Sequence, residues 1–138
     1  MTRLFPELYG FALFSSNGLQ EYIKQNSINK NLLGYLEDES NSKKLMEEKL
    51  IYPIFNMEEG LYSFEYSFSE DGKESHIKSD GGLAICGVGY LADFSYKSLI
   101  ENQKAIEFPV PQGEYEIGFS INSDKEHIMI EFKRLKSE

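Results

Sequence analysis

AIEFPVPQGEYEIGFSINSDKEHIMIEFKRL, residues 105–135, is the stretch of sequence that decides the fold. Apolar and polar residues alternate here in three runs, at 105–110, 115–121 and 127–135, and a period of two is typical of strands with one buried face. Pro-Gln-Gly and Asn-Ser-Asp-Lys, which separate the runs, favour turns. The pattern therefore predicts a three-stranded antiparallel meander. Its apolar face is expected to contain Tyr115, Ile117, Phe119, Ile121, Ile128, Ile130 and Phe132.

A second alternating segment lies upstream, at 62–69, where four aromatic residues are interleaved with Ser and Glu. This pattern predicts a strand with one aromatic face. Asp71 and Gly72 suit a tight hairpin turn, so 75–78 is expected to return alongside that strand. The apolar run 83–86 then predicts a further strand, buried within the fold.

The N-terminal half mixes both types of secondary structure. A short apolar run over 8–16 predicts a buried strand, and the helical spacing of apolar residues predicts a helix over 18–26. Polar residues able to cap a helix precede a second helix expected at 42–50, and 51–55 is expected to be extended. The segment 28–36 fits either type. The fold class expected for the whole chain is α+β, a mainly antiparallel β-sheet or sandwich packed by two short N-terminal helices.

The composition indicates a single domain, 1–138, that folds without covalent cross-links. The chain is 41% hydrophobic and 14% aromatic, and its 138 residues suffice to bury a core. The single cysteine, Cys86, lies in an apolar run and excludes an internal disulfide, which favours a reducing compartment. No apolar run at the N-terminus fits an export signal, and none elsewhere is long enough to span a membrane. We therefore expect a cytoplasmic protein with no membrane partner.

The net charge of −9 argues against nucleic acid as a partner, because phosphate backbones are bound by clustered Lys and Arg. The acidity is uneven along the chain. Residues 37–74 contain eleven acids and four lysines, which gives this segment alone a balance of −7. A negative field of this kind speeds association with a positively charged protein. The charge therefore predicts a basic protein partner.

The acidic segment is interleaved with tyrosines, which offer a large, rigid contact area with a polar end. Solvated charge around core aromatic residues would produce the same pattern. We take the acids as candidate partner-binding residues and three of the tyrosines as candidate anchors. These residues are Glu37, Asp38, Glu39, Glu47, Glu48, Glu58, Glu59, Tyr35, Tyr52 and Tyr62.

Two patterns could belong to an enzyme, and each has a plainer interpretation. The string GVGYLA at 87–92 matches the dinucleotide-binding pattern G-x-G-x-x-A, and Glu107 follows at a suitable distance, but no succession of βαβ units surrounds it. Glycines at a bulge or at the end of a strand are the plainer interpretation. Cys86 with His76 and His127 could form a nucleophilic pair or a zinc site, yet no ligand spacing supports either. The sequence therefore predicts no enzyme, no catalytic residue, no cofactor and no metal.

The C-terminal half contains the segment GLAI at 82–85 and the segment IEFPVPQGEYEI at 106–117, in which Pro-x-Gly-x-Tyr opens the next strand. In these two segments it resembles bacterial immunity and nuclease-inhibitor proteins. The nearest pattern is that of competence protein J-like inhibitors. It implies a β-sandwich that blocks a cognate nuclease. The N-terminal half, which contains the candidate partner-binding residues, has no part in the match.

Together these observations predict a cytoplasmic immunity or inhibitor protein. Its partner is expected to be a cognate bacterial toxin, basic and of the nuclease type, which it neutralises by occlusion of the surface that binds the toxin's substrate. The alternative is a small-ligand-binding β-domain without catalysis, with the aromatic face of 62–68 as its pocket. The sequence leaves the oligomeric state open.

Overall fold

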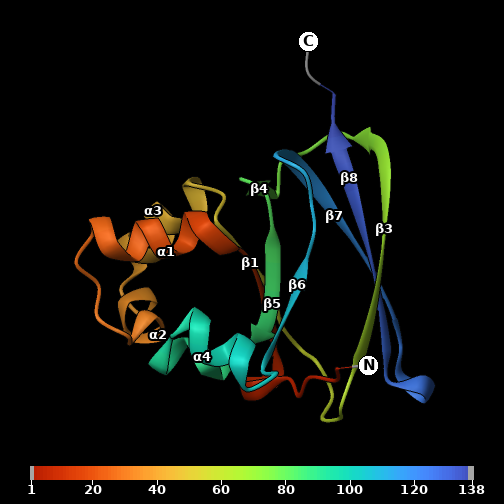
Figure 1. Ribbon diagram of the computed structural model, residues 1–138, viewed down its shortest axis with the longest axis horizontal. Coiled ribbons are helices and arrows are strands. Elements are labelled where there is room, and N and C mark those ends of the chain that lie inside the picture. Colours follow the sequence, from red (N-terminus) through yellow and green to blue (C-terminus); the bar gives the residue numbers. More distant parts are fainter. Residues whose placement is uncertain (1, 137–138) are drawn as a thin grey trace.

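Two four-stranded β-sheets pack face to face, and helices cover the outer face of one of them (Figure 1). The computed structural model describes residues 2–136. The first sheet is antiparallel throughout and has the order β2 (Ile51–Ile54), β1 (Phe11–Ser15), β5 (Leu83–Gly87), β6 (Ala105–Phe108). The second sheet has the order β3 (Ser63–Gly72), β8 (His127–Leu135), β7 (Gly113–Asn122), β4 (Ile77–Ser79). The predicted α+β class, with a largely antiparallel sandwich, is confirmed.

Short helices connect and cover the strands. The α-helices are α1 (Ser16–Gln25), α2 (Leu32–Leu36), α3 (Glu39–Glu47) and α4 (Tyr96–Glu101), and the 3₁₀ helices are η1 (Glu7–Tyr9), η2 (Val88–Asp93) and η3 (Ser123–Lys125). α1 and α3 confirm the two predicted N-terminal helices, whereas α2 lies in the segment left open and α4 is absent from the prediction. No helix in the described part of the chain has the length and apolar character needed to cross a bilayer.

Side-chain caps explain where α2, α3 and α4 begin, and in α4 the cap is Ser95 Oγ, which accepts the Ser98 N–H at 3.4 Å. The Asp38 carboxylate accepts a hydrogen bond from the Asn41 N–H at 3.1 Å, so α3 starts at residue 39 rather than at 42. Asn31 caps α2 in the same way through the Gly34 N–H, at 2.9 Å. α4 has six residues, too few for a clear periodic signal, and it is held by packing Leu99 into the core beneath the helices.

The first sheet is buried on both faces and separates two hydrophobic cores. On one face Phe11, Leu13 and Ile85 pack against the second sheet, and on the other face Phe14 and Cys86 pack beneath the helices. Every residue of β1 and β5 is buried, as expected for strands that are covered on both sides. This explains why these two strands are continuous apolar runs in the sequence rather than alternating ones.

The predicted three-stranded meander is wrong at its first strand. β7 and β8 form the expected antiparallel hairpin, but β6 pairs with β5 in the other sheet. The chain crosses between the sheets at Pro109 and Pro111, which have no N–H to donate to a neighbouring strand. The Tyr115 hydroxyl fixes this crossing by donating a hydrogen bond to the Pro111 carbonyl at 2.8 Å. The predicted apolar face is buried except for Phe119, which is half-buried, and Ile121, which is exposed. Alternation shows which face of a strand is buried, but it does not show to which sheet the strand belongs.

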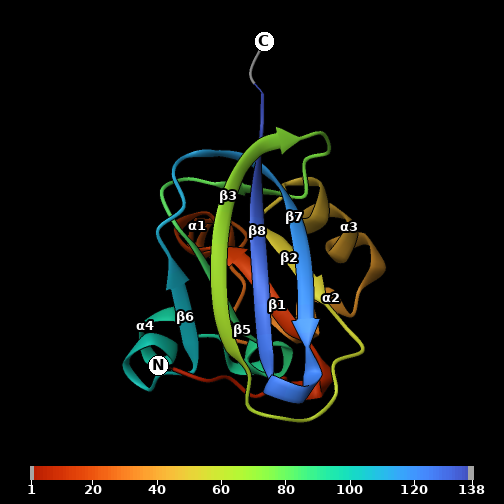
Figure 2. The ribbon, with the colours of Figure 1, turned by 90° about the vertical axis from the view of Figure 1, so that its right-hand side faces the viewer.

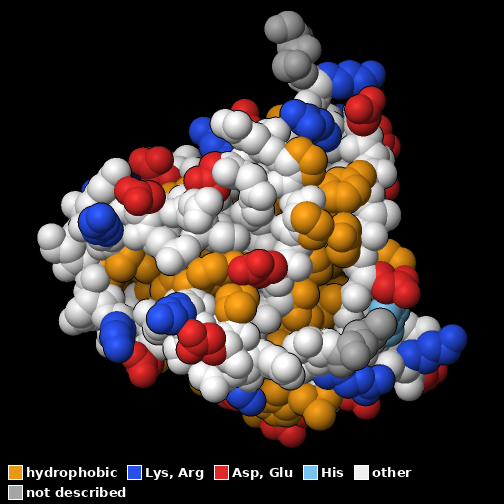
Figure 3. All heavy atoms as spheres, in the orientation of Figure 1, with side chains coloured by type: hydrophobic (Ala, Val, Ile, Leu, Met, Phe, Trp, Pro, Cys, Tyr) orange, Lys and Arg blue, Asp and Glu red, His pale blue; other side chains and the backbone are white. Residues whose placement is uncertain are grey.

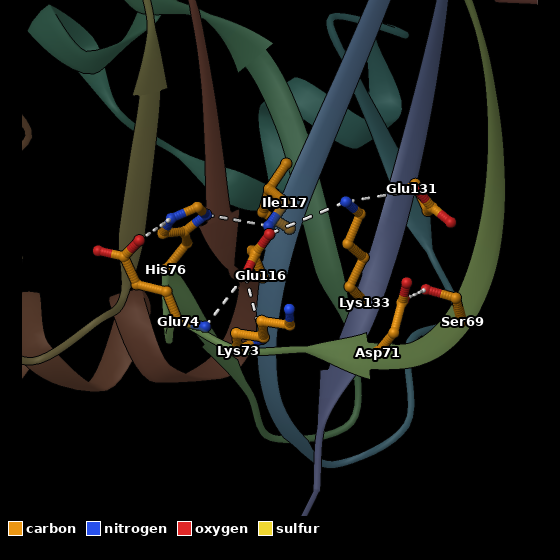
Figure 4. Close-up of polar contacts among 9 residues, drawn as sticks. All are labelled: Ser69, Asp71, Lys73, Glu74, His76, Glu116, Ile117, Glu131 and Lys133. Atoms are coloured by element: carbon orange, nitrogen blue, oxygen red, sulfur yellow. Dashed lines mark hydrogen bonds and ion pairs between the residues drawn. The ribbon is translucent and has the colours of Figure 1, made fainter.

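The predicted hairpin between β3 and β4 is also wrong. β3 pairs in parallel with β8, and β4 pairs with β7 at the opposite edge of the same sheet. Their connection therefore crosses the end of the sheet, where the Glu116 carboxylate accepts backbone N–H groups of Lys73 at 3.1 Å and Glu74 at 3.0 Å (Figure 4). The His76 ring adds a further contact, since its Nδ1 accepts the Ile117 N–H at 3.0 Å. These bonds to β7, which is distant in sequence, take the place of the tight turn.

Glu116 gives the fold a measurable pH dependence. The two backbone N–H groups, with Lys133 Nζ 3.8 Å from its carboxylate, hold the pKa of Glu116 below its usual value of 4.5. Because the pKa is lower in the folded chain, the charged carboxylate stabilises the fold above pH 4.5, and this contribution is lost as the pH falls through the folded-state value. We expect Glu116→Gln to lower the free energy of unfolding at neutral pH and to have a smaller effect in acid, near pH 3, where the carboxyl of the unfolded chain is protonated. Urea unfolding of both proteins at the two pH values measures this. An effect of equal size at both would contradict the role of the charge.

Candidate partner-binding surface

Large apolar side chains are exposed at the end of the sandwich away from the C-terminal end of β8, and three of them belong to η1 and to the loop that follows β2. Leu8 is 60% exposed, Tyr9 is 61% exposed and Phe55 is 59% exposed. Figure 2 shows the segment that contains η1 close to the loop that follows β2, and the Met57 N–H of that loop donates to the Tyr9 carbonyl at 3.0 Å. We call Leu8, Tyr9 and Phe55 the end patch.

The backbone conformation turns these side chains outward. Leu8 and Tyr9 have φ angles of 58° and 59°, in the left-handed region that residues other than glycine rarely adopt. The next residue, Gly10, lies so close to β2 that a Cβ there would be 2.7 Å from the Ile54 carbonyl oxygen and 3.1 Å from the ring of Phe55. Glycine at this position therefore lets η1 fold back onto the end of β2, beside Phe55.

An apolar pocket of about 250 Å³ adjoins the end patch. It lies between α2, α3 and β2, and its lining includes Leu33, Leu36, Met46, Phe55 and Val88. Phe55 belongs to both the pocket and the end patch, so the two surfaces are continuous. A pocket of this size can hold one apolar side chain of a partner.

The seven predicted acids all lie on the surface. Within residues 2–136 none of them takes part in an ion pair, so their charge is available to a partner. Glu37 lines the apolar pocket, and Glu58 and Glu59 follow Phe55 in the loop before β3. The structure therefore brings these three acids to the surroundings of the end patch.

The other predicted acids belong to α3 and its cap. Asp38 uses its carboxylate to cap the helix, and Glu39 lies in the first turn, where the helix dipole favours negative charge. Glu47 and Glu48 lie at the other end, about 12 Å along the axis at 1.5 Å per residue. These acids spread along the helix that bounds the pocket and do not gather at one point.

The three predicted tyrosine anchors make contacts within the fold. Tyr62 is 2% exposed, so its prediction as an anchor is wrong: its place in the strand alternation turns the ring into the core between the sheets. Tyr35 is half-buried, and its hydroxyl lies 2.8 Å from that of Tyr22. Tyr52 is half-buried and stacks on His76, with 5.0 Å between the ring centroids. Tyr35 and Tyr52 can therefore offer a partner only part of each ring.

The sequence patterns miss all three residues of the end patch. Leu8 and Tyr9 are predicted within one buried strand, and Phe55 is predicted within an extended segment. Pro6 is the signal that could have separated Leu8 and Tyr9 from that strand, because proline favours the first turn of a helix and it precedes η1 here. Phe55 is one of the aromatic residues interleaved with the acidic segment 37–74, but no local pattern separates it from those that are buried.

The glycine string at 87–92 is a packing feature. β5 ends at Gly87, and η2 follows it directly, which confirms the interpretation as glycines at a strand end. A Cβ on Gly87 would lie 2.9 Å from the backbone nitrogen of Glu7, and one on Gly89 would lie 2.8 Å from the Glu7 Cβ. The N-terminal segment therefore occupies the space through which a pyrophosphate would approach these glycines.

Cys86 and the two histidines lie on different sheets. Cys86 is buried beneath the helices, and burial raises the pKa of its thiol to about 12, so it is a poor nucleophile. His76 precedes β4, while His127 has Nδ1 2.7 Å from Ser63 Oγ and Nε2 3.5 Å from Glu65 Oε2. This Ser-His-Glu chain is not indicated by any sequence spacing, and Ser63 is 5% exposed, so a substrate has no access to its hydroxyl. Among the residues that the structure describes, no group of His, Cys, Asp and Glu is placed to hold a metal ion.

Comparison of the chain with protein-family models, with curated proteins and with solved structures finds no match. The fold and surface define an α+β sandwich protein that exposes an apolar patch among acids. The resemblance of its C-terminal half to immunity and nuclease-inhibitor proteins stays a prediction. The inference of function therefore rests on the exposed surface around the end patch.

Proposed function

We propose that the protein is a binding protein and not an enzyme: a cytoplasmic immunity or inhibitor protein whose partner is a cognate, basic, nuclease-type bacterial toxin. It neutralises the toxin by covering the surface that binds the toxin's substrate. The observation that carries the proposal is the end patch, whose three large apolar side chains are between 59% and 61% exposed. Exposed apolar surface of this kind marks a site of association.

The end patch and its surroundings have the composition of a protein interface. Binding energy in interfaces is concentrated in a few aromatic and apolar side chains, and polar or charged residues surround them. Here Tyr9 and Phe55 supply exposed rings, and the pocket beside Phe55 can receive a side chain of the partner. Exposed acids, including Glu37 and Glu58, supply the charged surroundings. This arrangement supports a protein partner with positive charge.

The net charge favours a toxin that acts on nucleic acid. Such an enzyme needs Lys and Arg to hold the phosphate backbone of its substrate. A chain with a net charge of −9 attracts that surface and speeds the encounter. Once bound there, the inhibitor excludes the substrate, so binding alone is sufficient for inhibition.

The backbone of the end patch also supports a binding role. Leu8 and Tyr9 are consecutive left-handed residues, and each costs on the order of 1–3 kcal/mol. Their conformation exposes both side chains, so burial within the fold does not offset this cost. Burial against a partner would offset it.

The alternative of a small-ligand-binding domain loses much of its expected pocket. Of the aromatic face at 62–68, Tyr62 and Phe64 are buried in the core between the sheets. Tyr66 and Phe68 stay exposed, but they lie on a strand at the edge of a sheet. Phe68 lines a pocket of about 200 Å³, which is below the roughly 300–1,000 Å³ of typical small-ligand sites, so this open edge suits a macromolecule better.

Affinity capture from a lysate of the native cells tests the proposal. The tagged protein is compared with a triple variant at the surroundings of the end patch, Glu37→Lys, Glu58→Lys and Glu59→Lys. A control variant of the same total charge changes exposed acids on other elements. Its substitutions are Glu21→Lys, Glu101→Lys and Glu114→Lys. Captured proteins are identified by mass spectrometry at low and at high salt.

We expect one basic protein at near-stoichiometric yield with the wild type and with the control, less of it at high salt, and about tenfold weaker binding by the first variant. The purified partner should lose its nuclease activity when the wild-type protein is added. Equal binding by the two triple variants would contradict the role of this surface. A partner whose activity survives saturation would contradict inhibition.

A further inference from the structure

The edge of β3 is the longest strand edge that the described sheets leave open. β3 has ten residues, whereas the other edge strands, β2, β4 and β6, have three or four. Natural proteins shorten such edges or block them with proline or bulges, since an open edge can pair with another chain. β2 carries Pro53, but β3 has no proline, and its only register shift comes after Ser69. The part of β3 before Ser69 is therefore fit for pairing.

This edge already accepts one antiparallel bridge from the chain itself. Leu4 and Tyr62 exchange both backbone hydrogen bonds, at 2.9 Å and 2.8 Å. The next N–H, that of Ser63, points to the other side and donates to the Glu126 carbonyl at 2.9 Å. Because backbone groups alternate between the two sides of a strand, those of the even-numbered residues in 64–68 point to the open side. The bridge at Tyr62 thus shows how a longer antiparallel strand would add to β3.

An aromatic stripe lies uncovered beside the open edge. Tyr66 is 40% exposed and Phe68 is 49% exposed, although both are on the inner face of β3. Their rings pack on Phe132, with centroids 6.2 Å and 5.7 Å away, and Tyr66 also packs on Phe108 at 5.4 Å. β6 ends at Phe108, so the first sheet does not extend over the rest of the stripe. Figure 3 shows apolar side chains along the opening between β6 and β3, the strands that face the viewer in the same orientation in Figure 1.

Acidic side chains border the stripe. Glu70 of β3 lines the same pocket as Phe68, and Glu65 is exposed on the outer face of β3. Arg134 lies at one end, in the pocket that contains Phe68, and its Nη2 donates to a backbone carbonyl at 2.9 Å. With the net charge of −9, these acids favour a positively charged occupant.

We propose that β3 binds an extended segment of a basic protein as an added antiparallel strand, the fifth strand of the second sheet. Apolar residues at alternate positions of the segment face Tyr66 and Phe68, and Lys or Arg between them face Glu65. Main-chain hydrogen bonds supply affinity, and the alternate side chains supply specificity. A second copy of this chain is disfavoured because it brings another charge of −9. The inference rests on the sheet edge and is independent of the end patch and of the proposed function.

A synthetic peptide of alternating Lys and Val, with blocked ends and a fluorescent label, tests the proposal on the intact protein. The main control is the same peptide with its Val nitrogens methylated, because Val residues that face the stripe direct their N–H groups toward β3. A second control has the same composition with all Lys before all Val, and it measures charge attraction alone. Binding is followed by fluorescence anisotropy, and backbone protection is followed by hydrogen exchange.

We expect the alternating peptide to bind at least about tenfold more tightly than either control, since several hydrogen bonds are lost by methylation. Hydrogen exchange should slow at Tyr66 and Phe68 when the peptide is bound. Tyr66→Pro, which removes an N–H on the open side and keeps the bonds to β8, should weaken binding to the level of the methylated peptide. The end-patch substitution Phe55→Ala should leave peptide binding unchanged.

Three results would overturn the proposal. The first is equal binding of the alternating and methylated peptides. The second is slowed exchange on β2, β6 or β7 in place of β3. The third is self-association of the protein alone with protection of β3, which would assign the edge to a second copy. The hydrogen-exchange result on the wild type decides the question even where Tyr66→Pro does not fold.

Discussion

Replacing Phe132 by alanine is expected to lower the free energy of unfolding by about 3–5 kcal/mol, the cost of removing a fully buried phenyl ring. Phe132 is completely buried on β8, inside the second sheet. Its ring centroid lies 5.7 Å from those of Phe68 and Phe108 and 6.2 Å from those of Tyr66 and Tyr115. A typical domain is stable by about 5–15 kcal/mol, so this loss is on the order of one third of the total stability.

Urea unfolding measures this loss, with the slope against urea concentration expected to stay the same. Phe68→Ala is the matched control, because it removes the same ring from a contact partner that is 49% exposed. We expect the control to lose less than half as much stability. Losses of equal size in the two variants would contradict the burial of the Phe132 ring between the sheets.

Phe55→Ala is expected to weaken binding of the protein partner about thirtyfold or more, which corresponds to the 2 kcal/mol that defines an interface hot spot. Phe55 is 59% exposed in the free protein, so the truncation costs little folding stability. On binding, its ring would be buried together with the adjoining apolar pocket. Calorimetric titration with the purified partner measures the affinity, and thermal unfolding verifies the fold.

Phe68→Ala is again the matched control, since it makes the same change at an exposed ring on β3. We expect it to leave this affinity unchanged, because the end patch and the β3 edge are separate surfaces. Unchanged affinity with Phe55→Ala would remove the end patch from the interface. If only Phe68→Ala lowered the affinity, the interface with the partner would lie at the edge of β3.

The strand faces could be predicted with success from the sequence. Ile128, Ile130 and Phe132 are buried on β8 as the alternation predicts, because the side chains of a strand alternate between its faces whatever its partners are. Pairing could not be predicted in the same way. β6 and β7 are neighbours in the chain and lie in different sheets, whereas β3 and β8 are distant in the chain and lie side by side. Which strands become neighbours depends on which apolar faces meet across the core.

The candidate surface was only partly predictable. The exposure of acids such as Glu37 and Glu58 follows from the cost of burying an unpaired charge, and it holds for all seven. Aromatic residues obey no such rule, because both core and interface use them. Tyr62 is therefore buried although it is a predicted anchor, and Phe55 is exposed although it is not among the predicted anchors.

Local periodicity and composition are sufficient for the α+β class, for the helices α1 and α3, for the buried faces of the strands and for the acidic surface. These features depend only on interactions between residues that are neighbours in the chain and on the solvation of single side chains. The parallel pairing of β3 with β8, the open edge of β3 and the exposure of the end patch arise only when the chain packs. Each of them depends on contacts between residues far apart in the chain, such as Glu116 with Lys73 and Gly10 with Phe55, and no local pattern records the free energy of such contacts.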